Sequence, residues 1–473
     1  MQVLDSCFLA AGSGASSWRA FESLGSVRRR PSAPKKAGRR LYLSVHVKFC
    51  IAIIFSLGWG SGAIWMATRW FADLSTLIGP VAAALIIFGI AVIPGFMNAF
   101  LVVSLLLDWR PKVHANLARL PDITILVAAY NEEKSIAGTL HSLARQDYPG
   151  RFRVIVIDDG STDGTLATVM RFGDRPWLSV IALLRNGGKA QALNEGLKQV
   201  DTPLTLTVDG DSWLYKDALR NLVARYVSDP PNTRAVAGAV LVRNSRDTLA
   251  TRVQEWDYFH GIAAIKRLQS LYQGTLVAQG AFSAYDTAVL RSVGGWPATV
   301  GEDIVLTWSF LKAGWRIGFA ENACLFTNAP DTWRQFARQR QRWSRGLIEA
   351  FKSNWQLLFK PRMTTLFIWW NLFFPYMDLV FTLAFIPGLL LACFGFYWIA
   401  GPMTLLVLPL GILVNYLMFS IQSRMFAEQG LRVRKNVLGF VLYSVFYSVI
   451  LQPACVVGYA QELLNRAKRW NTK

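Results

Sequence analysis

Long apolar runs near both ends of the chain enclose a central stretch in which short apolar runs alternate with polar ones. The first two long runs, residues 49–71 and 77–107, are separated by a short polar turn. Each is long enough for a helix that crosses a bilayer core of about 30 Å. The second contains Pro80 and Pro94, which membrane helices tolerate. This pattern predicts a transmembrane hairpin, with two buried core helices as the alternative.

More apolar runs follow the central stretch, at residues 363–396, 403–420 and 437–459. Basic residues precede the hairpin and follow it, so the positive-inside rule places both of its ends in the cytoplasm. The same rule disfavours three crossings after the central stretch, because these would put Lys468 and Arg469 outside. One run is therefore expected to lie in the membrane interface, and residues 366–375 are the candidate.

Four short strand-like runs in the central stretch each end in polar residues and are followed by a helical pattern. The strands are expected at residues 123–129, 153–157, 180–184 and 204–208, and the first helix at residues 135–144. Such alternation predicts an α/β domain with a mainly parallel sheet. Ligands of these sheets bind beyond the carboxyl ends of the strands. The polar residues that follow the strands are therefore expected to share one crevice.

Composition supports a membrane protein with a soluble centre. The 473 residues are 53% hydrophobic and carry a formal net charge of +20, and the mean hydropathy is +0.29. The basic clusters flank apolar runs, which favours a face against anionic lipid over nucleic-acid binding. Five scattered cysteines support neither a disulfide framework nor a zinc site. The expected organisation is a disordered basic tail (1–45), two transmembrane helices (46–108), the α/β domain (109–346), and an interfacial helix with C-terminal transmembrane helices (347–473).

Acidic residues follow two of the predicted strands. Asp209 and Asp211 lie directly after the fourth strand, where a tight turn can aim both carboxylates at one point. Mg²⁺ is usually held by one or two carboxylates together with substrate phosphates, so the pair suits a nucleotide diphosphate; a plain turn is the alternative. Asp158 and Asp159 end the second strand, where carboxylates can accept hydrogen bonds from a base or ribose. A helix N-cap at Ser161 or Thr162 with acidic neighbours is the alternative there, and the two are compatible.

A lysine and a second carboxylate pair extend this set. Lys189 follows two glycines, and a cation on such a loop suits phosphate; a surface lysine is the alternative. Glu302 and Asp303 open an apolar helix expected at residues 304–313. A carboxylate held rigidly there can take a proton from an acceptor hydroxyl, and Asp303 is the candidate base. An acid favoured by the helix dipole is the alternative.

The segment around residue 340 combines a guanidinium with a large aromatic ring. Arg342 can hold a diphosphate through two hydrogen bonds, and Trp343 can stack on the apolar face of a sugar ring, with Gln339 one helical turn earlier. An amphipathic basic helix on the membrane surface is the alternative, and the two roles are compatible.

Taken in order, these motifs resemble the processive branch of glycosyltransferase family 2, which includes cellulose, chitin, hyaluronan and poly-N-acetylglucosamine synthases. The resemblance covers about residues 123–346. Two apolar runs before the domain and several after it are similar to the arrangement in bacterial poly-β-1,6-N-acetylglucosamine and hyaluronan synthases. The resemblance implies a cytoplasmic GT-A domain, inversion at the anomeric carbon, a UDP-sugar donor, and Mg²⁺ or Mn²⁺ as the cofactor.

The resemblance also implies roles for the matching residues. The residues that it implies bind the donor are Tyr130, Glu132, Asp158, Asp159, Lys189, Asp209 and Arg342. Metal binding falls to Asp209 and Asp211, and catalysis to Asp303 with Glu302. Acceptor binding falls to Gln279, Gly280, Gln339 and Trp343. Gln279 departs from the Ser or Thr common in related sequences, and Gly301 departs from a frequent Thr, with little effect expected because Glu302 and Asp303 are intact.

We therefore predict a multi-pass enzyme of the inner membrane, an inverting β-glycosyltransferase that elongates a polysaccharide and passes it through its own helices. UDP-N-acetylglucosamine and poly-β-1,6-N-acetylglucosamine are preferred by resemblance, with a hyaluronan-type or chitin-type synthase as the nearest rival. Rivals from other classes are a non-processive transferase with a lipid acceptor and a membrane scaffold or nucleotide sensor. The expected partners are the UDP-sugar, the growing polysaccharide and membrane lipid. A small membrane partner subunit is left open, and no nucleic acid is expected.

Overall fold

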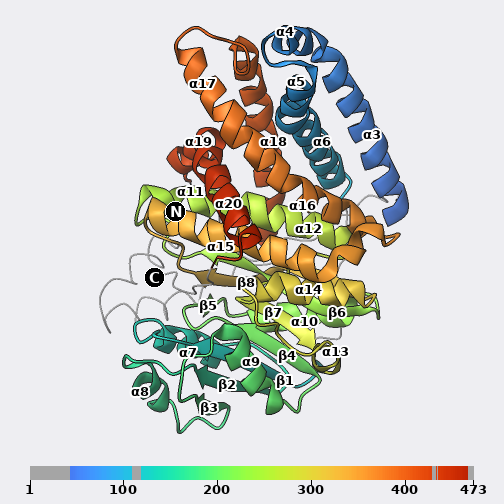
Figure 1. The fold of residues 1–473 in the computed structure, drawn as a ribbon. Helices are drawn as coiled ribbons and strands as arrows, with labels where there is room; N and C mark the ends of the chain where they lie inside the picture. Colours follow the sequence, from blue (N-terminus) through green and yellow to red (C-terminus); the bar gives the residue numbers. More distant parts are fainter. Residues whose placement is uncertain (1–42, 109–118, 429–432, 434, 467–473) are drawn as a thin grey trace.

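The computed structural model describes residues 43–108, 119–428, 433 and 435–466. These residues form an α/β domain, a bundle of apolar helices, and a layer of amphipathic helices between the two (Figure 1). Nearly all of the predicted basic tail lies outside the described residues. So do basic residues on which the positive-inside argument rests, namely Arg110, Lys112, Lys468 and Arg469.

Within the described residues, an eight-stranded mixed sheet has the strand order β3-β2-β1-β4-β7-β6-β8-β5. The strands expected from the sequence form a parallel half, made of β1 (Ile123–Ala129), β2 (Phe152–Asp158), β3 (Leu178–Ala182) and β4 (Leu204–Val208). The other half is made of β5 (Trp213–Leu214), β6 (Thr233–Val242), β7 (Phe282–Asp286) and β8 (Arg316–Thr327). Because β7 runs antiparallel between β4 and β6, the sheet is mixed, although β6 and β8 again run parallel to each other.

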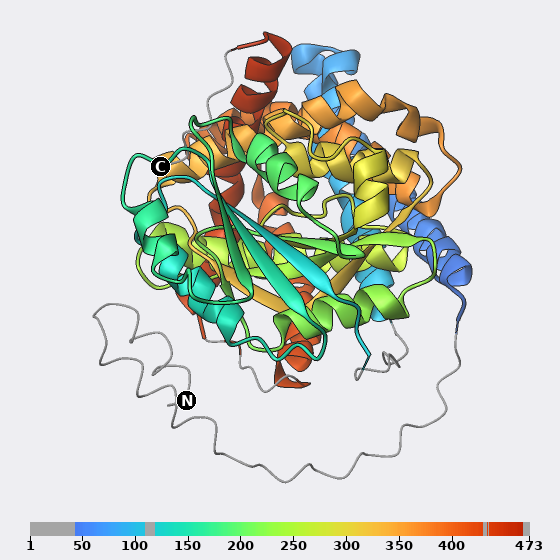
Figure 2. The ribbon, with the colours of Figure 1, turned by 90° about the horizontal axis from the view of Figure 1, so that it is seen from below.

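Helices cover both faces of the sheet, as the view from below shows (Figure 2). They are α7 (Ile136–Ala144), α8 (Thr165–Met170), α9 (Lys189–Lys198), α10 (Ala218–Ser228), α13 (Thr287–Ser292) and α14 (Glu302–Lys312). In β1, Leu126 packs into the core on the α9 and α14 side, whereas Ile125 and Val127 pack into the core on the α7 and α10 side. Burial on both faces explains why the parallel strands read as continuous apolar runs.

A layer of amphipathic helices separates the sheet from the apolar bundle (Figure 1). One continuous stretch contains α11 (Leu249–Trp256), the π-helix η3 (Asp257–Ile262) and α12 (Ala263–Leu271). The long helix α15 (Trp333–Asn354) lies in the same layer and is followed by η4 (Trp355–Phe359). The stretch 249–271 was not expected from the sequence, because its buried polar residues Asp257, His260 and Lys266 interrupt the apolar pattern.

Three helices among the described residues are long and apolar enough to cross a membrane: Val45–Met66, Pro80–Leu106 and Met363–Cys393. The first is α3 (Val45–Met66). The second consists of α5 (Pro80–Ile87), η2 (Phe88–Val92) and α6 (Ile93–Leu106). The third consists of α16 (Met363–Val380), η5 (Phe381–Phe385) and α17 (Ile386–Cys393). The remaining helices are α4 (Thr68–Ile78), α18 (Pro402–Glu428), α19 (Val437–Val445) and α20 (Tyr447–Leu463). The last two pass the same test as a pair but are bent by 52°. Residues 366–375, the candidate interfacial run, belong to the third of these long helices.

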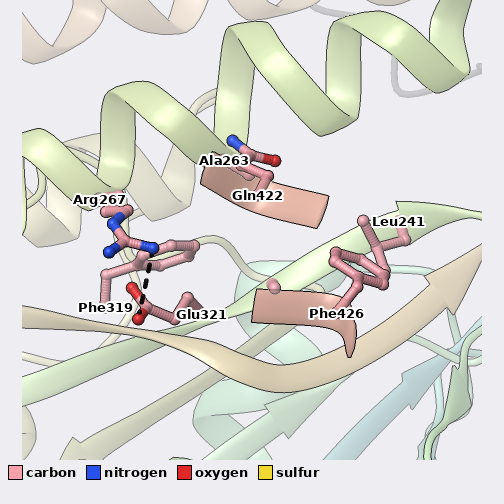
Figure 3. A pocket seen from close by; sticks show the side chains of 8 residues that line it. Leu241, Ala263, Arg267, Phe319, Glu321, Gln422 and Phe426 are labelled. Carbon is pink, nitrogen blue, oxygen red and sulfur yellow. Dashed lines mark ion pairs between the residues drawn. The ribbon is translucent and has the colours of Figure 1, made fainter. Parts of the chain in front are cut away.

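Ion pairs connect the second apolar helix to the sheet through α12. Arg267 of α12 pairs with Asp108, just after α6, and lies 3.6 Å from Glu321 of β8 (Figure 3). Gln422 and Phe426 of α18 help to line a cavity of about 10 Å³ beside this cluster. That volume suffices for about one water molecule. The cluster therefore fixes α12 between the membrane helices and the sheet.

Two glycines bring α14 and α15 into close contact. A Cβ atom built on Gly301 would lie 2.5 Å from the Cα atom of Gly346, and one on Gly346 would lie 2.8 Å from the Cα atom of Gly301. Backbone atoms cannot yield as a flexible side chain can. This packing leaves no room for a side chain at either position, and the expectation that glycine in place of threonine has little effect on Glu302 and Asp303 stays a prediction.

We predict that Gly301→Ala lowers the Tm of the detergent-solubilised protein, because overpacking of a close contact typically costs about 1–3 kcal/mol. The matched control is Gly138→Ala within α7, where a built Cβ atom meets nothing within 4 Å. Removing a mid-helix glycine at an open position should be neutral or stabilise by about 0.5–1 kcal/mol. Thermal unfolding of both variants checks this, and equal changes in Tm would contradict the packing argument.

Candidate active site

The carboxyl ends of β1, β2 and β4 carry the predicted donor-side residues, and these strands are neighbours in the sheet. Tyr130, directly after β1, is 42% exposed, and Glu132 follows it. Asp159 follows β2, while Asp209 and Asp211 follow β4, both half-buried. Parallel strands end at the same edge of a sheet, so the structure brings these residues to one edge, as expected.

Asp159 organises the loop that leads into α9. Its two carboxylate oxygens accept hydrogen bonds from the N–H groups of Gly187, at 2.9 Å, and Gly188, at 2.8 Å. Burial raises the pKa of Asp159, and these two N–H groups act in the opposite direction. Gly188 directly precedes Lys189, the first residue of α9. Asp159 therefore positions the loop that presents Lys189.

The N-cap alternative for the second strand end does not match the structure. Helix α8 begins at Thr165, and Gly164 is its N-cap residue, without a side-chain cap. Ser161 instead accepts a hydrogen bond from the N–H of Asn131 at 3.0 Å, which joins the loops after β1 and β2. Asp158 is buried and accepts a hydrogen bond from the N–H of Ser161 at 3.3 Å. Asp158 thus helps to hold the loop after β2 through this buried hydrogen bond.

Lys189 joins the donor-side carboxylates to the pair at the start of α14. Its ammonium forms an ion pair with Asp209 and lies 3.9 Å from Oε1 of Glu302. Burial alone would lower the pKa of Lys189, but the attraction of Asp209 and Glu302 outweighs burial and raises it. A Cβ atom built on Gly280 would lie 2.9 Å from the same Nζ atom, so a side chain at position 280 would displace the end of Lys189.

Glu302 and Asp303 differ in exposure and surroundings. Glu302 is 6% exposed, and burial together with the Asp303 charge raises its pKa to about 7, against the opposing charges of Lys189 and Arg342. Asp303 is half-buried, and its carboxylate accepts hydrogen bonds from the N–H groups of Gly280, at 3.3 Å, and Ile304, at 2.8 Å. Asp303 is therefore held in place and partly accessible, whereas Glu302 faces the interior.

The predicted acceptor loop contacts a lysine that the sequence alone does not single out. Oε1 of Gln279 accepts a hydrogen bond from the ammonium of Lys266 in α12, and Nε2 donates to the carbonyl of Gly238 at 2.7 Å. Lys266 is 7% exposed, and burial lowers its pKa to about 7. In the sequence it looks like any lysine on an amphipathic helix, and only the packing of α12 against the loop reveals its place.

The Gln339 to Trp343 segment lies in the middle of α15. Trp343 is 38% exposed, and the guanidinium of Arg340 lies 4.0 Å from the centroid of its ring. Burial raises the pKa of the Tyr258 hydroxyl, and the side chain of Gln339 acts in the opposite direction. Arg342 acts electrostatically on Glu302, where its charge lowers the pKa. The charge of Arg342 therefore acts at Glu302, and contact of the whole motif with the Glu302 and Asp303 pair stays a prediction.

The two aspartates after β4 offer oxygen ligands at the same edge. Asp211 accepts a hydrogen bond from the hydroxyl of Thr327 at 3.4 Å. Across the described residues, no group of three or more His, Cys, Asp or Glu side chains is placed to hold a metal ion. One or two carboxylates completed by substrate phosphates is the usual arrangement for Mg²⁺. Asp209 and Asp211 fit a divalent ion that is bound together with a nucleotide.

The mixed sheet, with carboxylates at the ends of its parallel strands and a carboxylate pair opening α14, defines a GT-A-type glycosyltransferase. Residues 121–346 match the family described as "Glycosyltransferase like family 2". This central domain belongs to glycosyltransferase family 2, and the protein is a glycosyltransferase that has helices long and apolar enough to cross a membrane on both sides of the domain.

Relatives agree with this assignment. The chain is 28% identical over 285 residues to a poly-beta-1,6-N-acetyl-D-glucosamine synthase of Staphylococcus aureus (strain COL), covering 58% of this chain and 68% of the relative. It is 30% identical over 247 residues to a protein of the same name from Staphylococcus epidermidis, and the match covers 52% of this chain and 59% of the relative. A mannosyltransferase from Pyrobaculum calidifontis, PcManGT, solved in complex with GDP-Man and Mn²⁺, has a TM-score of 0.52 at 18% identity, covering 89% of this chain and 100% of that one. The structural likeness supports the fold.

The raised pKa of Glu302 gives a pH-dependent prediction. A carboxyl group whose pKa rises on folding destabilises the folded state as pH increases from the ordinary value of 4.5 to about 7. Below that range Glu302 is protonated in both the folded and the unfolded state, so it does not destabilise the fold. Above that range the destabilisation has reached its full size. We predict that the Tm of Glu302→Gln relative to wild type is higher at about pH 8 than at about pH 5. A difference that shrinks with rising pH would contradict the buried, raised-pKa assignment.

Proposed function

We propose that this protein is an inner-membrane enzyme that transfers a sugar from a UDP-sugar to the end of a growing polysaccharide on the cytoplasmic face. One observation carries the proposal: Lys189 joins Asp209, on the donor side, to the pair of carboxylates that contains the candidate base. The names of the two staphylococcal relatives support N-acetylglucosamine as the sugar and a β-1,6-linked polymer as the product.

The donor side is argued from the ends of the parallel strands. Tyr130, exposed beside Glu132, would cover the base of the nucleotide, and Asp159 would accept hydrogen bonds beside it. Lys189 and Arg342 would contact the diphosphate, because both lie near Glu302 and carry positive charge into the crevice. Planar guanidinium groups bind such oxygens through paired hydrogen bonds.

Asp209 and Asp211 would hold Mg²⁺ or Mn²⁺ together with the donor diphosphate. Both side chains are half-buried and present carboxylate oxygens, which hard divalent ions prefer. When bound, the ion would neutralise negative charge that develops on the leaving diphosphate. Lys189 would leave Asp209 and add its own positive charge to the same oxygens.

Asp303 would act as the general base. As the acceptor hydroxyl oxygen forms its bond to the anomeric carbon, its proton passes to the Asp303 carboxylate and the bond to the diphosphate breaks. Displacement from the face opposite the leaving group inverts the anomeric configuration. The N–H of Gly280 orients the carboxylate, and the buried Glu302 holds Lys189 rather than meeting the acceptor.

The acceptor side supports elongation next to the membrane. Trp343 offers a partly exposed ring on α15, and α15 is tied to α20 by the ion pair of Arg345 with Glu462 at 3.3 Å. A polymer end that stacks on Trp343 would therefore lie beside the apolar helices through which it could leave. A hyaluronan-type enzyme with two donors is the nearest alternative.

We predict that the purified protein, in detergent with Mn²⁺ or Mg²⁺, makes a polymer from UDP-N-acetylglucosamine alone, which a β-1,6-specific glycosidase degrades. A panel of single and paired UDP-sugars, with sizing of the products, makes the measurement. If a polymer forms only when two UDP-sugars are present together, the hyaluronan-type alternative is correct instead. A protein that binds UDP but forms no polymer from any donor would contradict the elongation proposal.

We predict that Asp303→Asn lowers the transfer rate by about 10²–10⁴-fold, the usual contribution of a general base. UDP affinity by calorimetry should stay within about twofold, because the side chain keeps its shape and the donor contacts lie elsewhere. Asp174→Asn, at an exposed position after α8, is the control and should change neither quantity. A loss of UDP affinity as large as the loss of rate would show that Asp303 serves the donor instead.

A further inference from the structure

Residues outside the predicted motifs hold the ring of Trp343. Arg340, one turn earlier in α15, places its guanidinium 4.0 Å from the ring centroid. Arg340 is 4% exposed and forms an ion pair with Asp257 at 2.7 Å. Tyr258, the next residue, has its ring centroid 6.3 Å from that of Trp343. The partly exposed indole is thus fixed by a buried cation and by a second aromatic ring.

The two supporting residues come from an unusual turn. Asp257 and Tyr258 are consecutive residues at the start of the π-helix η3, and both contact α15. Single π turns within α-helices are rare and frequently lie at functional sites. Just before the turn, Trp256 stacks on His260 with 4.8 Å between ring centroids. The turn is therefore packed on its own helix while its first two side chains reach α15.

Stability alone does not account for this ion pair. A buried pair of charges is often no more stable than apolar side chains of the same volume. Burial would lower the pKa of Arg340, and the attraction of Asp257 outweighs burial and raises it, so the cation persists beneath the ring. Its guanidinium also lies 4.8 Å from the ring of Phe336. A desolvated cation against an aromatic face is attracted more strongly than an exposed one, and here that contact is made with the ring of Trp343, the candidate acceptor platform.

We propose that Arg340 is a positioning residue for the acceptor: it is held by Asp257, covers one face of Trp343, and fixes the ring so that its exposed part meets the acceptor sugar. Tyr258 limits the tilt of the ring from the side. A ring that is fixed before the sugar arrives loses less conformational freedom on binding, which strengthens acceptor binding without touching the donor. This inference rests on the proposed function, since it takes a glycan as the ligand of Trp343.

The test compares two reactions of the purified full-length protein with the UDP-sugar that wild type uses. One is hydrolysis of the donor without acceptor, and the other is transfer to a short oligosaccharide of the same sugar. Arg340→Lys keeps the charge opposite Asp257 but lacks the planar group that lies over the indole. We expect it to raise the KM for the oligosaccharide about tenfold, with donor hydrolysis within about twofold of wild type.

Three further variants separate positioning from folding. Arg338→Lys, at an exposed position of the same helix, is the matched control and should leave both reactions unchanged. Trp343→Ala should show the same selective rise in acceptor KM as Arg340→Lys, and larger. If Arg340→Lys does not give monodisperse protein, the double variant Asp257→Leu with Arg340→Met replaces the pair by apolar side chains and should show the same rise in KM.

The outcomes distinguish the two levels of inference. If wild type transfers sugar and the Arg340 variants lose donor hydrolysis and transfer by the same factor, or lose neither, the positioning role is wrong while the proposed function stands. If wild type neither hydrolyses the donor nor transfers its sugar, the proposed function itself is wrong.

Discussion

The ammonium group of Lys189 is the contact on which the candidate active site depends. It lies at the first residue of α9, pairs with Asp209 beyond β4, and stays within 3.9 Å of Glu302 at the start of α14. With 21% of the side chain exposed, a lone charge would be unfavourable here, and so would a lone carboxylate at Glu302. The three groups therefore stabilise one another, and through them three separate elements converge on one point.

Much of the donor side could be predicted, because its signals are local. A buried parallel strand is a short apolar run, and the polar residues that follow it mark its carboxyl end, so β1, β2 and β4 and the polar residues after them are visible in the sequence. The resemblance to family 2 supplied the roles, and the match over residues 121–346 confirms the family. The roles of the single residues stay predictions.

The parts that escaped the sequence depend on contacts between distant segments. The strand β7 enters the sheet antiparallel between β4 and β6, and no local pattern fixes that order. Lys266 and Asp257 look like surface residues of an amphipathic helix, yet both are buried, Lys266 against Gln279 in the loop before β7 and Asp257 against Arg340 of α15. The contact of Gly301 with Gly346 is likewise invisible without the packing of α14 on α15. The local sequence pattern does not show that a polar residue is buried, because burial depends on the segment that packs against it.

The layer of amphipathic helices makes the acceptor side continuous with the membrane part. Arg267 connects α12 to Asp108 at the end of the second apolar helix, and Arg345 and Lys352 of α15 both pair with Glu462 of α20. The same helix α15 presents Trp343 and contacts α14 beside Asp303. The apolar helices and the helix that packs on α14 are thus joined through a few ion pairs, an arrangement that the proposed transfer next to the membrane would use.

The most direct test is an experimental structure of the protein with UDP and Mn²⁺. We predict density for the diphosphate between Asp211, Lys189 and Arg342, with Mn²⁺ within coordination distance of the Asp211 carboxylate. The Lys189 ammonium should have moved from Asp209 to a diphosphate oxygen, while Asp303 stays on the N–H of Gly280. UDP bound away from the carboxyl ends of β1 and β4, or Lys189 still paired with Asp209 beside a bound diphosphate, would contradict the assignment of this crevice to glycosyl transfer.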